Sequence, residues 1–251
     1  MARSTSQDNP TSAAQGSTAP PLSPPSEPHS IGSLTAETVN TTAVFLQWEQ
    51  PEEYQSTYWY QVQTSGCLTP PQASNTTIEN ITLTDLTPGT NCIFTVSVIT
   101  EDGVEGEAKS ISKYTKPETV QPNISNNQSN DTITVSWEAP AGNVESYEVL
   151  LRSRNGNQTR DGPGGGNQTF TFRNLSAGTI YNATVITRSG PFNETSEEST
   201  TATYPNPPES ITRTDEATNL ISIEWTPAFF MTDADDFSYS VTISNHSNVS
   251  K

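Results

Sequence analysis

Apolar and polar residues alternate in short stretches of this chain, and the stretches recur at a nearly constant interval. Three of them end at a tryptophan, Trp48, Trp137 and Trp225, which lie 89 and 88 residues apart. In each stretch every second residue before the tryptophan is apolar, which is typical of a strand with one buried face. A proline follows each tryptophan within three residues, and its missing N–H would interrupt a sheet. The pattern therefore predicts a β-rich unit repeated along the chain.

A second alternating stretch follows each tryptophan. Its apolar positions are Tyr58, Tyr60 and Val62 in the first copy, Tyr147, Val149 and Leu151 in the second, and Tyr239, Val241 and Ile243 in the third. The first two copies continue through a corner written LTPGTNCIFTVSV (residues 86–98) and LSAGTIYNATVIT (residues 175–187). Short strands separated by Gly, Pro and Asn predict an all-β protein composed of β-sandwiches.

The succession W-x-x-P, Y-x-V and L-x-x-G-T-x-Y over about 89 residues resembles the fibronectin type III domain. The resemblance implies two sheets, with strands A, B and E against strands C′, C, F and G. Two complete domains are expected at residues 31–116 and 117–204. A partial third, 205–251, stops after strand C and lacks the strands that would cover its apolar face. Residues 1–30 are rich in Ser, Thr, Pro and Gln and are expected to be disordered, as an O-glycosylated stalk or a plain linker.

Asparagine occurs in the acceptor triplet for N-glycosylation more often than composition explains. Thirteen of the twenty asparagines begin an Asn-X-Ser/Thr triplet, namely Asn40, Asn75, Asn80, Asn123, Asn127, Asn130, Asn157, Asn167, Asn174, Asn182, Asn193, Asn245 and Asn248. Chance predicts about five, so the excess indicates the secretory pathway; the alternative is a polar β-protein rich in Asn and Thr. Asn80 and Asn182 fall within expected strands but on the opposite parity from the core, so neither glycan would enter it.

The first corner carries Cys92 where the second carries Tyr181. In the fibronectin type III family, the tyrosine at this position packs between strands E and F, and its hydroxyl hydrogen-bonds to nearby backbone. Tyr181 fits that role and Cys92 does not. The family's topology places the end of strand C, near Cys67, beside the start of strand F. A Cys67–Cys92 disulfide is therefore expected, and two separate buried thiols are the alternative.

The composition excludes several classes of function. A formal net charge of −17 opposes binding to nucleic acid and to acidic membrane faces. His29 and His246 are the only histidines, which leaves no base for a Ser-His-Asp or Cys-His site and no zinc cluster, and neither cysteine begins a C-x5-R loop. The Gly-rich stretch 161–169 is expected to join strands C′ and E, and the stretch 229–238 to be an insertion before strand C. No catalytic residue, cofactor or metal site is expected.

Tandem units crowded with glycosylation triplets resemble the ectodomains of receptor-type tyrosine-protein phosphatases with many repeats. The resemblance implies an extracellular adhesion, ligand-binding and spacer segment, outside the plasma membrane, in a longer single-pass receptor whose phosphatase domain lies elsewhere. The chain itself is then no enzyme. Its partners would be an extracellular protein ligand or a second copy. Trp59 is the one large apolar residue expected to face outward, and packing under a neighbouring loop is favoured over a role as a binding anchor. The alternatives are a secreted matrix or adhesion glycoprotein of the tenascin or fibronectin kind, other receptors, and secreted enzymes that carry such modules.

Overall fold

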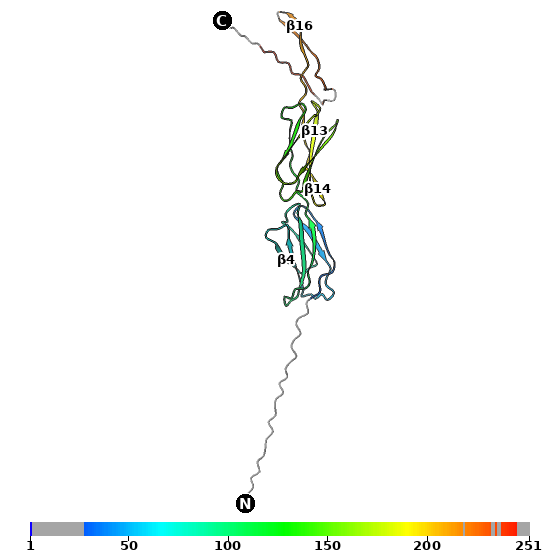
Figure 1. The fold of residues 1–251 in the computed structure, drawn as a ribbon, viewed down its shortest axis with the longest axis vertical. Coiled ribbons are helices and arrows are strands. Elements are labelled where there is room, and N and C mark those ends of the chain that lie inside the picture. Colours follow the sequence, from blue (N-terminus) through cyan, green and yellow to red (C-terminus); the bar gives the residue numbers. More distant parts are fainter. Residues whose placement is uncertain (2–27, 218, 232–233, 235–236, 245–251) are drawn as a thin grey trace.

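The computed structural model describes residue 1 and residues 28–217, 219–231, 234 and 237–244. Within these residues the chain contains strands and no helix. Figure 1 shows two sandwiches placed end to end, followed by a smaller two-stranded element. The expected all-β tandem architecture is therefore confirmed.

The first domain consists of two antiparallel sheets. One has the order β1-β2-β5 and contains β1 (Leu34–Thr38), β2 (Val44–Trp48) and β5 (Asn80–Leu83). The other has the order β4-β3-β6-β7 and contains β3 (Trp59–Ser65), β4 (Gln72–Thr76), β6 (Asn91–Ile99) and β7 (Lys109–Tyr114). These are the expected A, B, E sheet and the expected C′, C, F, G sheet.

The second domain repeats this arrangement. Its smaller sheet has the order β12-β9-β8 and contains β8 (Asn123–Ser125), β9 (Ile133–Trp137) and β12 (Gln168–Phe172). Its larger sheet contains β10 (Ser146–Ser153), β11 (Gly156–Pro163), β13 (Ile180–Ser189), β14 (Phe192–Thr195) and β15 (Ser199–Ala202). The Gly-rich stretch contributes the end of β11 and the loop to β12, as predicted.

The alternating apolar positions form one core in each domain. In both cores the tryptophan meets a fully buried tyrosine edge to face, Trp48 with Tyr60 at 5.2 Å between ring centroids and Trp137 with Tyr147 at 5.1 Å. Tyr60 is therefore the counterpart of Tyr147. The order of the apolar positions aligns Tyr58 with Tyr147 instead, which is wrong by two residues. The reason is that the first domain has two more residues between the tryptophan and strand C.

The described part of the third copy is an antiparallel pair, β16 (Ile211–Ala217) and β17 (Leu220–Trp225). The stretch 239–243, which alternation predicts to be a strand, forms none and is exposed. Among the described residues no strand lies beside it to exchange backbone hydrogen bonds. Tyr239 nevertheless stacks edge to face on Trp225, with ring centroids 5.5 Å apart.

The first domain begins slightly before residue 31. Pro28 is buried, and a side chain at Gly106 would clash with the Pro28 carbonyl, so the two backbones approach closely. Both the backbone N–H and the ring of His29 contact the carboxylate of Glu53. Residues 28–30 thus lie on the domain, whereas disorder was expected for 1–30; the rest of that segment, residues 2–27, lies outside the described residues.

Candidate functional site

The structure joins the two cysteines by a disulfide at the corner of the first domain. Cys67 follows β3, Cys92 lies near the start of β6, and their Cα atoms are 5.1 Å apart. Both side chains are buried in the core. The bond spans a sequence separation of 25 residues, for which the chain-entropy model gives about 3 kcal/mol of stabilisation.

The disulfide corner satisfies the same backbone group as the tyrosine corner. In the second domain the Tyr181 hydroxyl accepts a 2.9 Å hydrogen bond from the backbone N–H of Ser176. The counterpart of Ser176 is Thr87, whose N–H donates to the carbonyl oxygen of Cys67 at 3.0 Å. The Thr87 hydroxyl donates to the same carbonyl at 2.8 Å. Cys67 therefore supplies a backbone acceptor in place of the missing phenol.

The glycosylation triplets lie on accessible surface. Of the eleven sequon asparagines within the described residues, nine are exposed and two, Asn80 and Asn182, are half-buried. Asn182 pairs with Arg152 on the outward face of its sheet. Asn245 and Asn248 lie outside the described residues. No described sequon would therefore place a glycan in a core.

Two sequons flank Arg152 near one end of the outer face of the second domain's larger sheet. Arg152 on β10 pairs with Asn157 on β11 and with Asn182 on β13. The hydroxyl of Thr200 on β15 donates to the side-chain oxygen of Asn182 at 2.9 Å. Because neighbouring strands are about 4.8 Å apart, glycans on both asparagines would cover this row.

That outer face also carries charged residues. Glu148 on β10 pairs across the strands with Asp161 on β11. Arg188 on β13 contacts the Glu148 carboxylate and lies 3.9 Å from that of Asp161. The face therefore combines fixed charges with two glycosylation triplets.

Within its four strands the corresponding face of the first domain has no charged residue at an outward position, and exposed Glu105 pairs with the outward Ile99 just beyond β7. The accessible outward positions of this face are Trp59, Gln61, Gln63 and Ser65 on β3, Ala73 and Asn75 on β4, Asn91, Ile93 and Thr95 on β6, and Ser110, Ser112 and Tyr114 on β7. The amide nitrogen of Gln63 donates to the amide oxygen of Gln61 at 3.2 Å, and the hydroxyls of Thr95 and Ser110 are 2.8 Å apart. The outward side of these four strands thus presents uncharged residues, most of them amides and hydroxyls, and we call it the neutral face.

Trp59, which alternation predicts to face outward, has the outward parity at the start of β3 and is half-buried. Ile93, which is 46% exposed near the other end of the face, is the more accessible apolar residue. Its place between the core residues Cys92 and Phe94 is the sequence signal that indicates its outward direction.

Polar contacts join the first domain to the second. The Asn143 backbone N–H donates to the Pro88 carbonyl at 3.0 Å, and its side-chain amide donates to the Thr90 hydroxyl at 2.8 Å. The buried hydroxyl of Ser189 lies 3.0 Å from the carbonyl oxygen of Gly89 in the other domain. The residues joined across the two domains lie 53 to 100 positions apart, so local sequence patterns do not reveal the joint.

Glycines allow the domains to approach closely at this joint. A Cβ at Gly89 would lie 2.0 Å from the Asn143 carbonyl oxygen, and one at Gly142 would lie 2.4 Å from the Pro88 carbonyl oxygen. Gly178, the counterpart of Gly89, meets Met231 of the third copy in the same way, with the methyl carbon 2.6 Å from its virtual Cβ. In both domains the glycine of the L-x-x-G-T corner therefore contacts the copy that follows.

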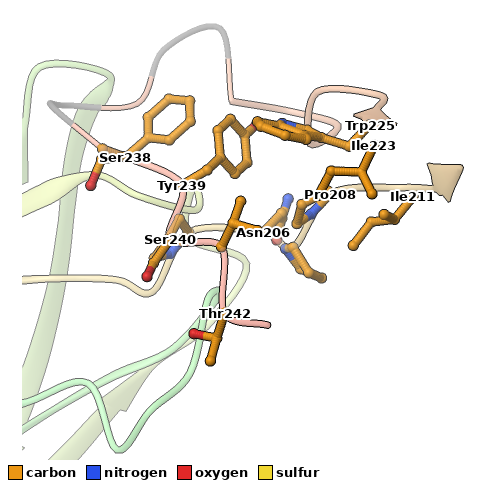
Figure 2. Close-up of a pocket in the computed structure, with 13 residues that line it drawn as sticks. Asn206, Pro208, Ile211, Ile223, Trp225, Ser238, Tyr239, Ser240 and Thr242 are labelled. Atoms are coloured by element: carbon orange, nitrogen blue, oxygen red, sulfur yellow. The ribbon is translucent and has the colours of Figure 1, made fainter. Parts of the chain in front are cut away.

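The third copy presents an open apolar groove of about 590 Å³. Figure 2 shows Ile211, Ile223 and Trp225 from the β16–β17 pair, with Tyr239 beside the tryptophan. In the first two domains the equivalent tryptophans are buried under a second sheet. The groove is therefore the core-facing side of a third sandwich.

A charged contact lies at the outer end of the first domain. The hydrogen bond from the His29 ring to the Glu53 carboxylate raises the pKa of His29 above its ordinary 6.5. Burial would raise the pKa of Glu53, but hydrogen bonds from the His29 backbone and ring outweigh it and lower that pKa. Both residues are exposed to solvent, so this contact is a pH-dependent surface feature.

The described residues hold no group of three or more His, Cys, Asp or Glu side chains that could bind a metal ion. No helix long and apolar enough to cross a membrane occurs among them. Trp48 Nε1, Trp137 Nε1 and the Tyr147 hydroxyl are buried without a hydrogen-bond partner, and all three residues belong to the two hydrophobic cores. The surfaces, rather than a pocket, are thus the candidate functional features.

Comparison with known proteins gives concordant matches. A family model described as the fibronectin type III domain matches residues 23–114 and 115–203. Human receptor-type tyrosine-protein phosphatase H is 28% identical over 197 residues, which are 76% of this chain and 17% of that protein. Chicken receptor-type tyrosine-protein phosphatase eta is 26% identical over 225 residues, which are 89% of this chain and 16% of that protein. The chain thus spans about a sixth of the length of these relatives.

Among solved structures, a segment of two fibronectin type III domains from chicken tenascin is similar, with a TM-score of 0.53 and 18% sequence identity. The match covers 69% of this chain and 99% of the tenascin segment. At this identity the likeness concerns the fold alone.

Proposed function

The chain belongs to the fibronectin type III family, and from this premise we propose that it is an extracellular, heavily N-glycosylated adhesion and spacer segment of a cell-surface receptor. The receptor is of the kind of the receptor-type tyrosine-protein phosphatases, and its catalytic domain lies outside this chain. The segment extends the receptor from the membrane and presents a protein-binding surface. On the rest of the segment's surface, glycan bulk and negative charge limit the close approach of neighbouring molecules.

One observation carries the proposal. All eleven described sequon asparagines are at least partly accessible, including the two within strands, although their triplets arise at points scattered over both domains. Because asparagine is polar and mostly exposed in any protein, this accessibility permits glycosylation, and the excess of triplets, thirteen where composition predicts about five, is what favours the secretory pathway over chance. The buried Cys67–Cys92 disulfide supports the same compartment, because disulfides persist in oxidising surroundings.

The proposed segment is catalytically silent. The one histidine among the described residues, His29, contacts Glu53 and no serine, threonine or cysteine, so it is not placed to activate a nucleophile. We expect the purified chain to turn over neither a phosphotyrosine peptide nor a generic phosphoester. Turnover that copurifies with the folded chain would contradict this.

A matrix glycoprotein is the second candidate, favoured by the likeness to the tenascin segment. That likeness is one of fold, whereas both phosphatase matches extend over three quarters of this chain or more. The receptor is therefore preferred.

Labelling of intact cells tests the proposal. An antibody raised against the purified chain should stain cells that make the parent protein without permeabilisation, and protease added outside should remove the signal. A cytosolic protein stained in parallel is the control, which must appear only after permeabilisation. Staining of the parent that needs permeabilisation would overturn the extracellular assignment, and signal in the medium and matrix alone would favour the second candidate.

A further inference from the structure

We propose that the indole of Trp59 binds the first N-acetylglucosamine of a glycan on Asn75, so that this glycan lies along the outer face of the first domain. The inference deepens the proposed function and rests on it, because it requires that the Asn75 triplet is glycosylated. The ligand is a sugar that the chain itself carries. Its binding site is an aromatic ring on the neighbouring strand of the same sheet.

The register of β3 and β4 places Asn75 and Trp59 on one face, a diagonal step apart. Asn75 on β4 pairs with Gln61 on β3, and Trp59 lies two residues before Gln61, with the same outward parity. Diagonal neighbours across an antiparallel pair are about 7–8 Å apart, which is within reach of large side chains. A sugar ring attached to the amide nitrogen of Asn75 is therefore within reach of the indole.

The residue between the two does not block this approach. The amide nitrogen of Gln63 donates to the amide oxygen of Gln61 at 3.2 Å. This bond draws the side chain of Gln61 along β3, away from Trp59. Asn75 is exposed, and so is Thr77, the hydroxyl residue of its triplet. The route from the triplet to the indole is therefore open.

Trp59 combines an anchor in the protein with an accessible part. Its partner on β6 is Ile99, which has the same outward parity and is nevertheless only 6% exposed. Trp59 lies directly opposite and is half-buried, so the two apolar side chains pack together on the outer face. The ring of N-acetylglucosamine has one face of C–H groups, and such groups pack on the electron-rich face of an indole. The sugar would thus cover the part of Trp59 that the protein leaves accessible.

The second domain has neither member of this pair. The equivalence of the two core tyrosines aligns β3 with β10, so Trp59 corresponds to Ser146. By the same register Asn75 corresponds to Asp161. The fold therefore does not need an aromatic side chain at this position. The tryptophan is present where the triplet is present and is replaced where the triplet is replaced, which favours the sugar as its partner.

NMR of the sugars provides the test. The full chain is secreted from animal cells that make only high-mannose glycans and receive carbon-labelled N-acetylglucosamine, and an endoglycosidase then trims each glycan to its first sugar. Thr77→Ala removes the triplet but keeps Asn75, so the signal that it abolishes belongs to the Asn75 sugar. Protons over an aromatic ring resonate upfield. We expect upfield C–H protons for this sugar in the wild type, and ordinary positions in Trp59→Leu, which keeps an apolar cover over Ile99.

Asn157 provides the matched control. It lies on β11, the strand equivalent to β4, and its neighbours on β10 are Arg152 opposite and Leu150 on the diagonal, neither of which is aromatic. Thr159→Ala removes its triplet and identifies its sugar. We expect the C–H protons of this sugar at ordinary positions with either residue at position 59.

Thermal unfolding of the first domain gives a second readout. Thr77→Ala should lower its midpoint by about 4 °C when Trp59 is present and by less than about 1 °C in the Trp59→Leu chain, because the sugar then has no ring to bind. Equal losses in the two chains would show that the indole does not hold the sugar.

Two further results would overturn the inference. One is an Asn75 sugar whose protons lie at ordinary positions and do not respond to Trp59→Leu. The other, from mass spectrometry of the same samples, is an empty Asn75 in a chain whose other triplets are occupied. Either result leaves the proposed function intact, whereas triplets that are mostly empty would contradict the proposed function itself.

Discussion

At the level of single residues, the two domains close the same corner with different chemistry. The backbone N–H of Ser176 donates a hydrogen bond to the Tyr181 hydroxyl, and the backbone N–H of Thr87 donates one to the carbonyl oxygen of Cys67. A buried N–H left unpaired costs about 1–3 kcal/mol, so each solution matters to its domain. The disulfide adds a covalent constraint that the second domain lacks.

Reduction of the disulfide should therefore affect one domain only. We expect it to destabilise the first domain by about 2–4 kcal/mol and to leave the second unchanged, because Tyr181 serves there. Thermal unfolding of the full chain with and without reductant, followed by domain-specific amide signals, measures this. An unchanged first transition, or two free thiols in native protein from secreting cells, would contradict it.

Substitutions at Cys67 and Cys92 separate the contribution of the disulfide from that of the hydrogen bond to the Thr87 N–H. Cys92→Tyr with Cys67→Ser should recover part of the lost stability, since the phenol can accept the Thr87 N–H as Tyr181 accepts that of Ser176. Cys92→Ser is the control and should recover none. Equal unfolding midpoints for the two variants would show that the corner hydrogen bond is irrelevant.

The contact of His29 with Glu53 should respond to pH. Because the pKa of His29 is raised above 6.5, the contact is present at lower pH and is lost as the pH rises through that raised value. Glu53→Gln should return the pKa towards 6.5. Titration of the His29 ring signal by NMR measures both, with His29→Gln to identify the resonance. A wild-type pKa at or below 6.5 would show that the contact does not form.

At the level of strands, periodicity predicted the sandwiches well because each strand has one buried face. Burial alternates along β2, β3 and β9 as the apolar positions indicated. Register was less accessible, since the alignment of Tyr58 with Tyr147 depends on the length of a loop that carries no periodic signal. The neutral face was missed for a related reason: its members share only the absence of charge, and they converge from four separate strands.

The β16–β17 pair should be the least protected part of the described chain. A two-stranded ribbon is marginal on its own, and Ile223 and Ile211 are exposed. We expect its amides to exchange about a thousandfold faster than those of β6 and β13, which lie inside complete sheets. Hydrogen exchange followed by mass spectrometry compares the three in one sample. Equal protection would show that the third copy folds as it stands.

At the level of the whole molecule, the joint between the first two domains sets their relative orientation. Gly142 has a φ of +80° and faces Pro88, whereas Gly165 in the same domain has a φ of +72° with no atom within 4 Å of its virtual Cβ. Both positions strain a non-glycine backbone to a similar degree, but only Gly142 touches the other domain. Comparing the same substitution at Gly142 and at Gly165 therefore separates the effect of local backbone strain from the effect of the interdomain contact.

Gly142→Ala should therefore change the angle between the domains, because its methyl group would lie 2.4 Å from the Pro88 carbonyl oxygen. Gly165→Ala should lose similar stability, roughly 1 kcal/mol, with no change of angle. Residual dipolar couplings measured on both domains report the angle. The same orientation in both variants would show that the joint does not constrain it.

The most direct test of the account is a site-by-site map of glycan occupancy. The full chain secreted from animal cells is treated with the amidase that converts each glycosylated asparagine to aspartate, and mass spectrometry locates the converted sites. The account predicts occupancy at most of the thirteen triplets, including Asn157 and Asn182 on either side of Arg152. Conversion at fewer than about four of the thirteen sites would mean that most triplets are not glycosylated, and it would contradict the extracellular assignment.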